Sequence, residues 1–280
     1  MADGVFWLHR RCYGREGDGV SSNSVKDLIR ERRTSIGSWL SFGYAPVCEI
    51  MARAGFEWLV IDMEHTGIGV AEAHHLIQVA DLAGCPPLVR VESNDAVAVK
   101  HAMDAGAHGV VVPQINSRAE AERAVASLYY PPRGERGAGL ARAQGYGLGF
   151  PDYRVWAERE SVLVVQIEHI DAVGRLEEIL AVEEVDGFMV GPYDLSASVG
   201  VPGNWDHPDV IDALAEVKRV IAKDLKTAGY HVVHSDVGEL SQRLDEGYRF
   251  IAYGDDMVFL AEKVRHDMEE VRVLLEGRGA

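Results

Sequence analysis

Residues 162–194 read VLVVQIEHIDAVGRLEEILAVEEVDGFMVGPYD, and this stretch decides the fold. It contains two apolar runs, Val162–Ile167 and Gly187–Val190, with apolar residues at helical spacing between them over Ala172–Leu180. The runs are nearly continuous in Val, Ile and Met, as expected of strands that are buried on both faces. Because neighbouring parallel strands need a crossover connection, which a helix supplies, the stretch predicts a β–α–β unit.

The same alternation of a short apolar run and a longer amphipathic segment extends over most of the chain. The further strands that we expect are Ser35–Leu40, Trp58–Asp62, Pro87–Arg90, Gly109–Val112, Tyr230–Val233 and Phe250–Ala252. The further helices that we expect are Ala45–Ala54, Val70–Leu82, Ala96–Ala105, Ser117–Leu128, Pro208–Ala228, Val237–Glu246 and Met257–Leu275. Eight such units in 280 residues predict a single α/β domain, the (β/α)8 TIM barrel, which takes about 250 residues. A doubly wound open sheet is the main alternative.

Two segments depart from this rhythm. Residues 1–23 mix Gly, Arg and Ser without periodicity, and we expect a flexible N-terminal extension that precedes a barrel domain over residues 24–280. The domain opens with a helix from about Ser24. The segment Tyr129–Tyr153 is rich in Gly, Pro and Arg, and it is expected to be a long loop.

Charge and cysteine content limit the partners and the compartment. The net charge of −16 opposes binding to nucleic acid or to an anionic membrane, although one Arg and one cation in a pocket still allow an anionic small substrate. No apolar stretch has the length of a transmembrane helix. Cys12, Cys48 and Cys85 do not pair evenly, and the N-terminus lacks the features of a signal peptide. We therefore expect free thiols and a cytoplasmic protein.

Polar residues follow the predicted strands, where the active site of an α/β barrel lies. They are Asp62, Glu64, His65, Arg90, Gln114, Gln166, Glu168, His169, Asp194, His234, Asp236, Asp255 and Asp256. Carboxylates that are crowded into one cleft raise each other's pKa unless a cation lies among them. The pattern predicts a site for a hard divalent cation, but the residues alone do not select its ligands.

Several segments of the sequence that contain these polar residues, or lie near them, resemble the HpcH/HpaI family of class II pyruvate aldolases. They are WLVIDMEH (58–65), Leu88–Arg90 followed by Asn94-Asp95, VVQIE (164–168), VDGFMVGPYDLSASVG (185–200), YPPRGER (130–136) and Gly139–Arg142. The resemblance runs from about Ser35 to Leu275, and the combination IDxEH … QIE … GPxDLS is specific.

The resemblance implies a role for individual residues. Glu168 and Asp194 match the two metal ligands, for Mg²⁺ or Mn²⁺ with Co²⁺ or Zn²⁺ as alternatives, and Arg90 matches the contact to the keto oxygen. His65 matches the catalytic histidine and Asp62 the carboxylate that orients it. The remaining matches are substrate-binding: Gln166 near the oxoacid, and the backbone of Gly191, Pro192, Tyr193 and Asp194 at the pyruvate carboxylate. Separately, Trp39 at a strand end is a candidate apolar wall of the pocket.

The implied activity is cleavage of 4-hydroxy-2-oxoacids to pyruvate and an aldehyde, and the reverse aldol addition, through a metal-stabilised pyruvate enolate. No Lys stands at a predicted strand end, which argues against a Schiff-base aldolase. One alternative uses the same enolate, as an oxaloacetate decarboxylase or a carbon–carbon bond-forming enzyme similar to macrophomate synthase. A second alternative is a barrel that binds or regulates without turnover.

The resemblance also implies a homo-oligomer, a hexamer built as a trimer of dimers, with the last helix packing on a neighbouring subunit. An apolar stripe over residues 258–275 allows that exchange, and it equally allows packing on the chain's own barrel. Among the other candidates, Glu64 and His169 would point differently from Asp62 and Glu168 if their strands continued that far. His74-His75 is expected on the surface, and Arg133, Arg136 and Arg142 are expected to anchor their loop, with Arg142 the nearest to the site.

Overall fold

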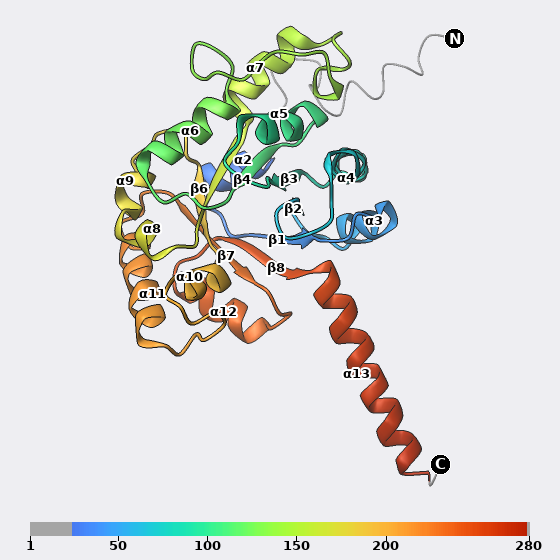
Figure 1. Cartoon of the computed structure of the whole chain (residues 1–280). Helices are drawn as coiled ribbons and strands as arrows, with labels where there is room; N and C mark the ends of the chain where they lie inside the picture. Colours follow the sequence, from blue (N-terminus) through green and yellow to red (C-terminus); the bar gives the residue numbers. More distant parts are fainter. Residues whose placement is uncertain (1–23, 279–280) are drawn as a thin grey trace, which may run out of the picture.

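Eight parallel strands close into a barrel in this computed structural model, which describes residues 24–278 (Figure 1). The strands are β1 (Ser35–Leu40), β2 (Leu59–Asp62), β3 (Pro87–Arg90), β4 (Gly109–Val112), β5 (Val162–Ile167), β6 (Gly187–Val190), β7 (Thr227–Val232) and β8 (Phe250–Asp255). Each strand pairs with the next one in the sequence, and β8 pairs with β1. The predicted barrel is confirmed, whereas the predicted extension over residues 1–23, with Cys12, lies outside the described residues.

Helices cover the outside of the barrel. They are α2 (Ser24–Arg30), α3 (Ala45–Arg53), α4 (Val70–Ala83), α5 (Ala96–Ala105), α6 (Arg118–Leu128), the 3-10 turn η1 (Arg142–Gln144), α7 (Phe150–Glu160), α8 (Ile170–Gly174), α9 (Leu176–Leu180), α10 (Pro192–Ser198), α11 (Pro208–Ile221), α12 (Val237–Asp245) and α13 (Asp256–Glu276).

The helices differ from the prediction in several places, and the single helix expected over Ala172–Leu180 is divided into α8 and α9. The helix expected to reach Ala228 ends at Ile221, because the chain turns at Asp224, whose φ is +54°, and β7 begins at Thr227. The segment that was expected to be a loop up to Tyr153 contains η1 and the first turn of α7. The short helix α10 was not predicted, and it begins at Pro192, a residue whose fixed φ suits the first turn of a helix.

The strands bury side chains on both faces, which produces two apolar layers. The inner layer fills the barrel and includes Trp58, Val60 and Met189, while a larger outer layer packs the strands against the helices. Trp58 stacks on Phe250 with ring centroids 3.9 Å apart. A Cβ atom at Gly37 would lie 2.1 Å from the Trp58 ring, so this ring can occupy the barrel only beside a glycine.

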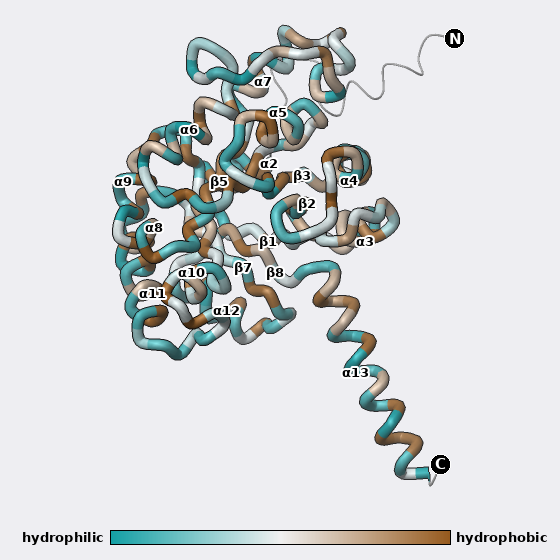
Figure 2. The backbone as a smooth tube through the Cα atoms, viewed as in Figure 1, coloured by the Kyte–Doolittle hydropathy of each residue, from teal (hydrophilic) through white to brown (hydrophobic). Residues whose placement is uncertain are grey.

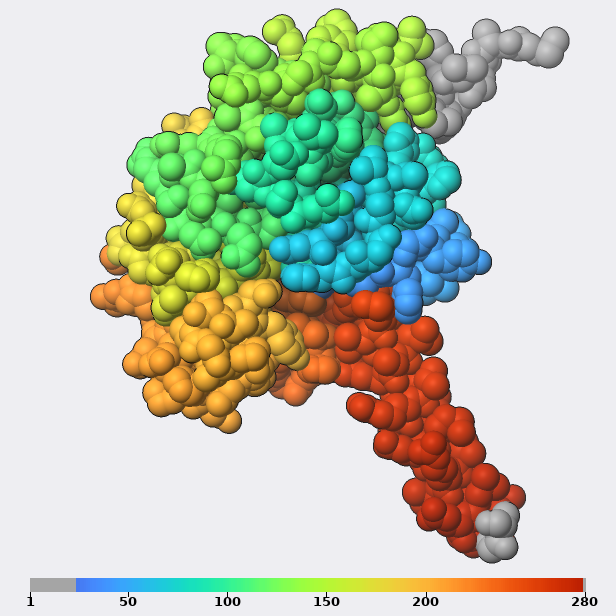
Figure 3. All heavy atoms as spheres, in the orientation of Figure 1, coloured from blue at the N-terminus to red at the C-terminus, as the bar shows by residue number. Residues whose placement is uncertain are grey.

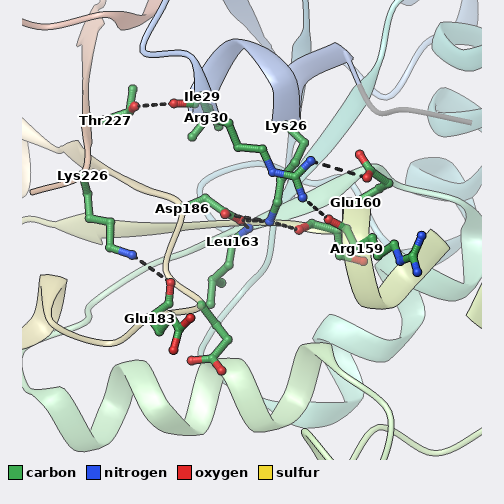
Figure 4. A network of polar contacts seen from close by, with 12 residues as sticks. Lys26, Ile29, Arg30, Arg159, Glu160, Leu163, Glu183, Asp186, Lys226 and Thr227 are labelled. Atoms are coloured by element: carbon green, nitrogen blue, oxygen red, sulfur yellow. Dashed lines mark hydrogen bonds and ion pairs between the residues drawn. The ribbon is translucent and has the colours of Figure 1, made fainter. Parts of the chain in front are cut away.

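A buried ion pair connects α2 to the N-terminal end of the barrel (Figure 4). Lys26 Nζ donates to Asp186 Oδ1 at 2.6 Å and to the carbonyl of Ser161 at 2.7 Å, and Asp186 Oδ2 also accepts the backbone N–H of Leu163. Burial lowers the pKa of Lys26, and the Asp186 charge opposes that shift. Thr227 donates to the carbonyl of Ile29 at 2.8 Å, so the start of β7 is held to the same helix.

The last helix, α13, leaves the body of the barrel. It projects away from the other elements in Figures 1 and 3, and hydrophobic residues recur along it in Figure 2. Leu260, Val264 and Leu275 are 57%, 54% and 47% exposed. Packing of this stripe on the chain's own barrel, one of the two expected arrangements, is therefore not what the structure has. Among residues 24–278, no helix combines the length and apolar character that crossing a membrane requires.

Replacing Lys26 with alanine is expected to lower the free energy of unfolding by about 3 kcal/mol, because Asp186 would remain buried without its cation. Urea denaturation followed by tryptophan fluorescence measures this change. Lys263→Ala is the control, since Lys263 pairs with Asp267 on the exposed face of α13 and should cost less than about 1 kcal/mol. Equal losses in the two variants would contradict a stabilising role for the buried pair.

Candidate functional site

A cavity of about 370 Å³ opens at the C-terminal end of the barrel. Nine of the ten predicted site residues line it, namely Trp39, Asp62, His65, Arg90, Gln166, Gly191, Pro192, Tyr193 and Asp194. The tenth, Glu168, is buried directly beside this lining, because an atom placed at the Cβ position of Gly191 would lie 2.7 Å from Glu168 Oε2. The structure thus brings together strand ends that are up to 155 positions apart in the sequence, from Trp39 to Asp194.

The deepest charge in the cavity is the Asp62–Arg90 pair. β2 and β3 place the two residues directly opposite each other, and Arg90 Nε and Nη2 donate to the two Asp62 oxygens at 2.8 and 2.7 Å. Burial opposes ionisation of Asp62, but the hydrogen bonds and charge of Arg90 outweigh it and hold the pKa of this carboxyl below its usual value. The bidentate contact fixes the plane of the guanidinium group.

Glu64 faces the same guanidinium group. Its Oε2 lies 3.2 Å from Arg90 Nη1. The alternation of side chains ends with β2 at Asp62, and the chain then turns, since Asp62 Oδ1 accepts the backbone N–H groups of Glu64 and His65. Burial raises the pKa of Glu64, while the charge of Arg90 opposes that rise.

His65 lies at the mouth of the cavity with its side chain 57% exposed. Its Nε2 is 3.8 Å from both Glu64 Oε2 and Asp194 Oδ2. Asp62 contacts the backbone N–H of His65 at 3.4 Å, so it holds the turn that carries the histidine. The predicted orientation of the imidazole itself by Asp62 stays a prediction.

Glu168 is 1% exposed and carries an oxygen without a protein partner. Its Oε1 accepts the backbone N–H of Gln114 at 2.8 Å, but within residues 24–278 no group donates a hydrogen bond to Oε2. Burial raises the pKa of Glu168 to about 7, with the Gln114 hydrogen bond opposing the rise and the charges of Glu64 and Asp194 adding to it. The φ of Gln114 is +55°, a strained value for a residue other than glycine.

Gly191 lets the backbone pass close to Glu168 and Gln166. A Cβ atom there would lie 2.7 Å from Glu168 Oε2 and 2.9 Å from Gln166 Nε2, so a side chain at this position would displace one of them. Immediately after Gly191, α10 begins, and its first turn carries Tyr193 and Asp194. The amides of a helix's first turn have no partner inside the helix.

These residues fit a divalent cation. Glu168 offers an unpartnered oxygen, and Asp194, whose side chain is 39% exposed, stands on the neighbouring strand end. Since the negative charges of Glu64 and Asp194 add to the rise in the pKa of the buried Glu168, a bound cation would remove a repulsion that burial has made costly.

The arginines of the long loop lie away from this cavity and act as anchors. Arg142 donates to Asp81 and to the carbonyl of Ala105, and Arg133 pairs with Glu158 and Glu184. Arg136 is fully buried against Asp104. The loop-anchoring prediction is confirmed for all three, and none of them, Arg142 included, lines the cavity.

Two histidines show how local context decides a role. His169 caps α8, because its Nδ1 accepts the backbone N–H of Asp171 at 3.1 Å. His231, which the sequence reasoning missed, lines the cavity with its Nε2 3.1 Å from the carbonyl of Gly254 and its ring edge-on to Trp39. Burial lowers the pKa of His231 to about 3, so the imidazole is neutral. The alternation of side chains along β7 could have identified His231, because it points to the opposite face of the strand from Tyr230 and Val232.

The comparisons with known proteins agree with this geometry. Residues 35–262 match the family described as HpcH/HpaI aldolase/citrate lyase. A hydroxypyruvate/pyruvate aldolase from Paraburkholderia phytofirmans is 38% identical over 258 residues, which cover 90% of this chain and 98% of that protein. A 4-hydroxy-2-oxovalerate aldolase from Rhodococcus jostii is 38% identical over 243 residues, which cover 86% and 93%.

A solved structure shows the same fold at similar identity. A HpcH/HpaI aldolase/citrate lyase family protein from Burkholderia cenocepacia superposes with a TM-score of 0.85 at 34% identity, over 90% of this chain and 100% of that one. The related aldolases are carbon–carbon lyases, and the family is in general dependent on a divalent metal. The chain belongs to the HpcH/HpaI aldolase/citrate lyase family.

Proposed function

We propose that this protein is a class II pyruvate aldolase that cleaves 4-hydroxy-2-oxoacids to pyruvate and an aldehyde and catalyses the reverse addition. The observation that carries the proposal is the pairing of two features in one cavity. One is the buried, unpartnered carboxylate oxygen of Glu168, and the other is the guanidinium group of Arg90 that Asp62 holds in a fixed plane. Together they favour a ligand that carries both a metal-binding group and a developing negative charge.

Glu168 and Asp194 would hold the cation, which we propose is Mg²⁺ or Mn²⁺, with Co²⁺ or Zn²⁺ as alternatives. When bound, it would supply Lewis-acid stabilisation to the negative charge that develops on the 2-oxo oxygen. Gln166 lies beside this position with a buried Oε1 that has no hydrogen-bond partner among the described residues. It is available to accept a hydrogen bond from water or substrate.

Arg90 adds a second positive group to the same oxygen. Asp62 binds two of its nitrogens, Glu64 Oε2 lies 3.2 Å from the third, and the guanidinium group lies 5.1 Å from the centroid of the Trp39 ring. Because the group is already oriented and desolvated, no reorganisation is needed as charge develops on the substrate.

His65 is proposed as the proton acceptor in the cleavage direction. It takes the proton of the C4 hydroxyl, the C3–C4 bond breaks, and its electron pair moves into pyruvate as the enolate while the aldehyde departs. The enolate then gains a proton at C3 to give pyruvate, and the protonated His65 supplies it directly or through water, which returns the imidazole to its neutral form. An imidazole at the cavity mouth suits this task near neutral pH.

The first turn of α10 is proposed to receive the pyruvate carboxylate. The backbone N–H groups in the first turn of a helix have no partner within the helix, so they can donate to an anion at the helix N-terminus. Gly191 allows this turn to stand against Glu168, so the carboxylate and the metal-binding oxygens lie on one side of the substrate.

We further infer that the protein is a homo-oligomer, a hexamer built as a trimer of dimers, in which α13 packs on a neighbouring subunit. The exposed apolar stripe of α13 supports this, since an isolated helix with such a stripe is stabilised by burial against a partner. The free, buried thiols of Cys48 and Cys85 support the proposed cytoplasmic location.

Purified enzyme is expected to add pyruvate to glycolaldehyde, and removal of metal with EDTA should lower the rate at least about 1,000-fold. Mass spectrometry of the product and a coupled assay for pyruvate measure the two directions. Oxaloacetate serves as the parallel substrate. Decarboxylation of oxaloacetate without any aldol addition would instead support the decarboxylase alternative, and full activity after metal removal would exclude both.

Glu168→Gln is expected to weaken Mn²⁺ binding by at least about tenfold, because the amide keeps the shape but loses the negative ligand. Isothermal titration calorimetry reads this out without relying on turnover. Glu178→Gln on the exposed face of α9 carries the same charge change and should leave the affinity unaltered. An unchanged affinity in Glu168→Gln would refute the ligand assignment.

The double variant Leu260→Asp/Val264→Asp is expected to form smaller assemblies than the wild type, because charges would replace the apolar surface of α13. Size-exclusion chromatography with light scattering measures the mass, which for the wild type should be about six chain masses. Lys263→Glu changes charge on the same helix without removing apolar surface, and it should keep the assembly intact. A monomeric wild type would contradict the inferred hexamer.

A further inference from the structure

A second cavity, of about 410 Å³, opens beside the first. The two share four lining residues, namely Pro192, Tyr193, His231 and Val233, so they are neighbours at the same end of the barrel. The second cavity continues over the end of β7 toward α11 and α12, whose positions relative to α10 can be followed in Figure 1. None of the roles proposed above uses this space.

An aromatic pair stands at the boundary between the cavities. The rings of Tyr193 and Trp205 meet edge to face, with centroids 4.7 Å apart and planes at 84°. Tyr193 lines both cavities, whereas Trp205 lines the second cavity but not the first. Tyr193 also immediately precedes the proposed metal ligand Asp194, and a substrate that extended from the metal site into the second cavity would pass Tyr193.

Beyond the pair, the lining is polar and carries an excess of negative charge. Arg243 stacks on Tyr230 at 4.2 Å, and its Nη1 and Nη2 donate to Glu246 at 2.9 Å and to Glu239 at 3.1 Å. Its charge is therefore shared between two carboxylates, of which Glu246 lies outside the lining. Asp236 and Glu239 both line the cavity, so the lining holds two carboxylates against one guanidinium group.

We propose that this second cavity binds the tail of the aldehyde, and that it selects a neutral hydroxylated tail over a carboxylated one. The proposal rests on the proposed aldolase function. Aromatic faces beside side chains that donate and accept hydrogen bonds suit a chain of hydroxyl groups. A carboxylate would lose its hydration next to Asp236 and Glu239, and the Arg243 charge is not free to compensate it.

Three aldehydes test the proposal in addition reactions with pyruvate. Glycolaldehyde is too short to reach past the aromatic pair, D-erythrose carries a neutral hydroxylated tail, and succinic semialdehyde carries a carboxylated tail of similar length. For each, kcat/KM is measured, and only ratios within one variant are compared. The wild type is expected to prefer D-erythrose over succinic semialdehyde by at least about tenfold.

Two variants alter the cavity in different ways. Trp205→Ala removes one wall and should lower the ratio of D-erythrose to glycolaldehyde about tenfold. Glu239→Gln keeps a hydrogen-bond acceptor for Arg243 but removes one negative charge, and it should shift the preference toward succinic semialdehyde about tenfold. Glu122→Gln on the exposed face of α6 has the same charge change and should leave both ratios unchanged.

The outcomes separate this proposal from the function on which it rests. A wild-type preference for succinic semialdehyde, or ratios that neither Trp205→Ala nor Glu239→Gln changes, would overturn the tail site while glycolaldehyde addition still supports the aldolase. Absence of addition to glycolaldehyde as well would mean that the aldolase function itself has failed.

Discussion

The bidentate contact between Asp62 and Arg90 is the interaction on which the rest of the site depends. Register alone places the two residues opposite each other on β2 and β3, and both are almost fully buried. An unpaired guanidinium group would be costly there, so the carboxylate makes a fixed positive charge possible inside the barrel. The same Asp62 oxygen organises the turn that carries Glu64 and His65. One buried pair thus fixes a guanidinium group and the turn that carries Glu64 and His65.

The space available to the Glu168 side chain is the second constraint on the site. Glu168 is ionisable, buried and beside other acids, an arrangement that burial and repulsion disfavour. It persists because Gln114 donates a backbone N–H from a strained conformation and because Gly191 leaves space for the carboxylate. Strain and a missing side chain are both costs to stability. Their presence together around one unpartnered oxygen indicates that this oxygen is kept for a ligand.

The barrel and most of the site were predictable from the sequence, because buried strands are apolar and the first polar residue after each one lies at a known end of the barrel. The direction of Glu64 was not predictable from alternation, because alternation holds only while the strand lasts and β2 ends at Asp62. The helix before β7 was predicted too long for a similar reason, since the spacing of apolar residues gives no indication of the turn at Asp224. Whether the α13 stripe packs on its own barrel was open, because an amphipathic pattern does not specify which surface it meets.

Both cavities carry more acidic than basic side chains, and this has a consequence for how a substrate would bind. A divalent cation held beside Arg90 would make the first cavity favourable for anionic oxygens, whereas Asp236 and Glu239 leave the second unfavourable. A 2-oxoacid with one carboxylate can then bind in one direction, with that carboxylate beside α10 and its neutral end toward Trp205. In a chain of net charge −16, a local reversal of sign also concentrates the anion where the reaction takes place. The acidic side chains of the second cavity would therefore help to orient the substrate, and the Tyr193–Trp205 pair stands between the two cavities.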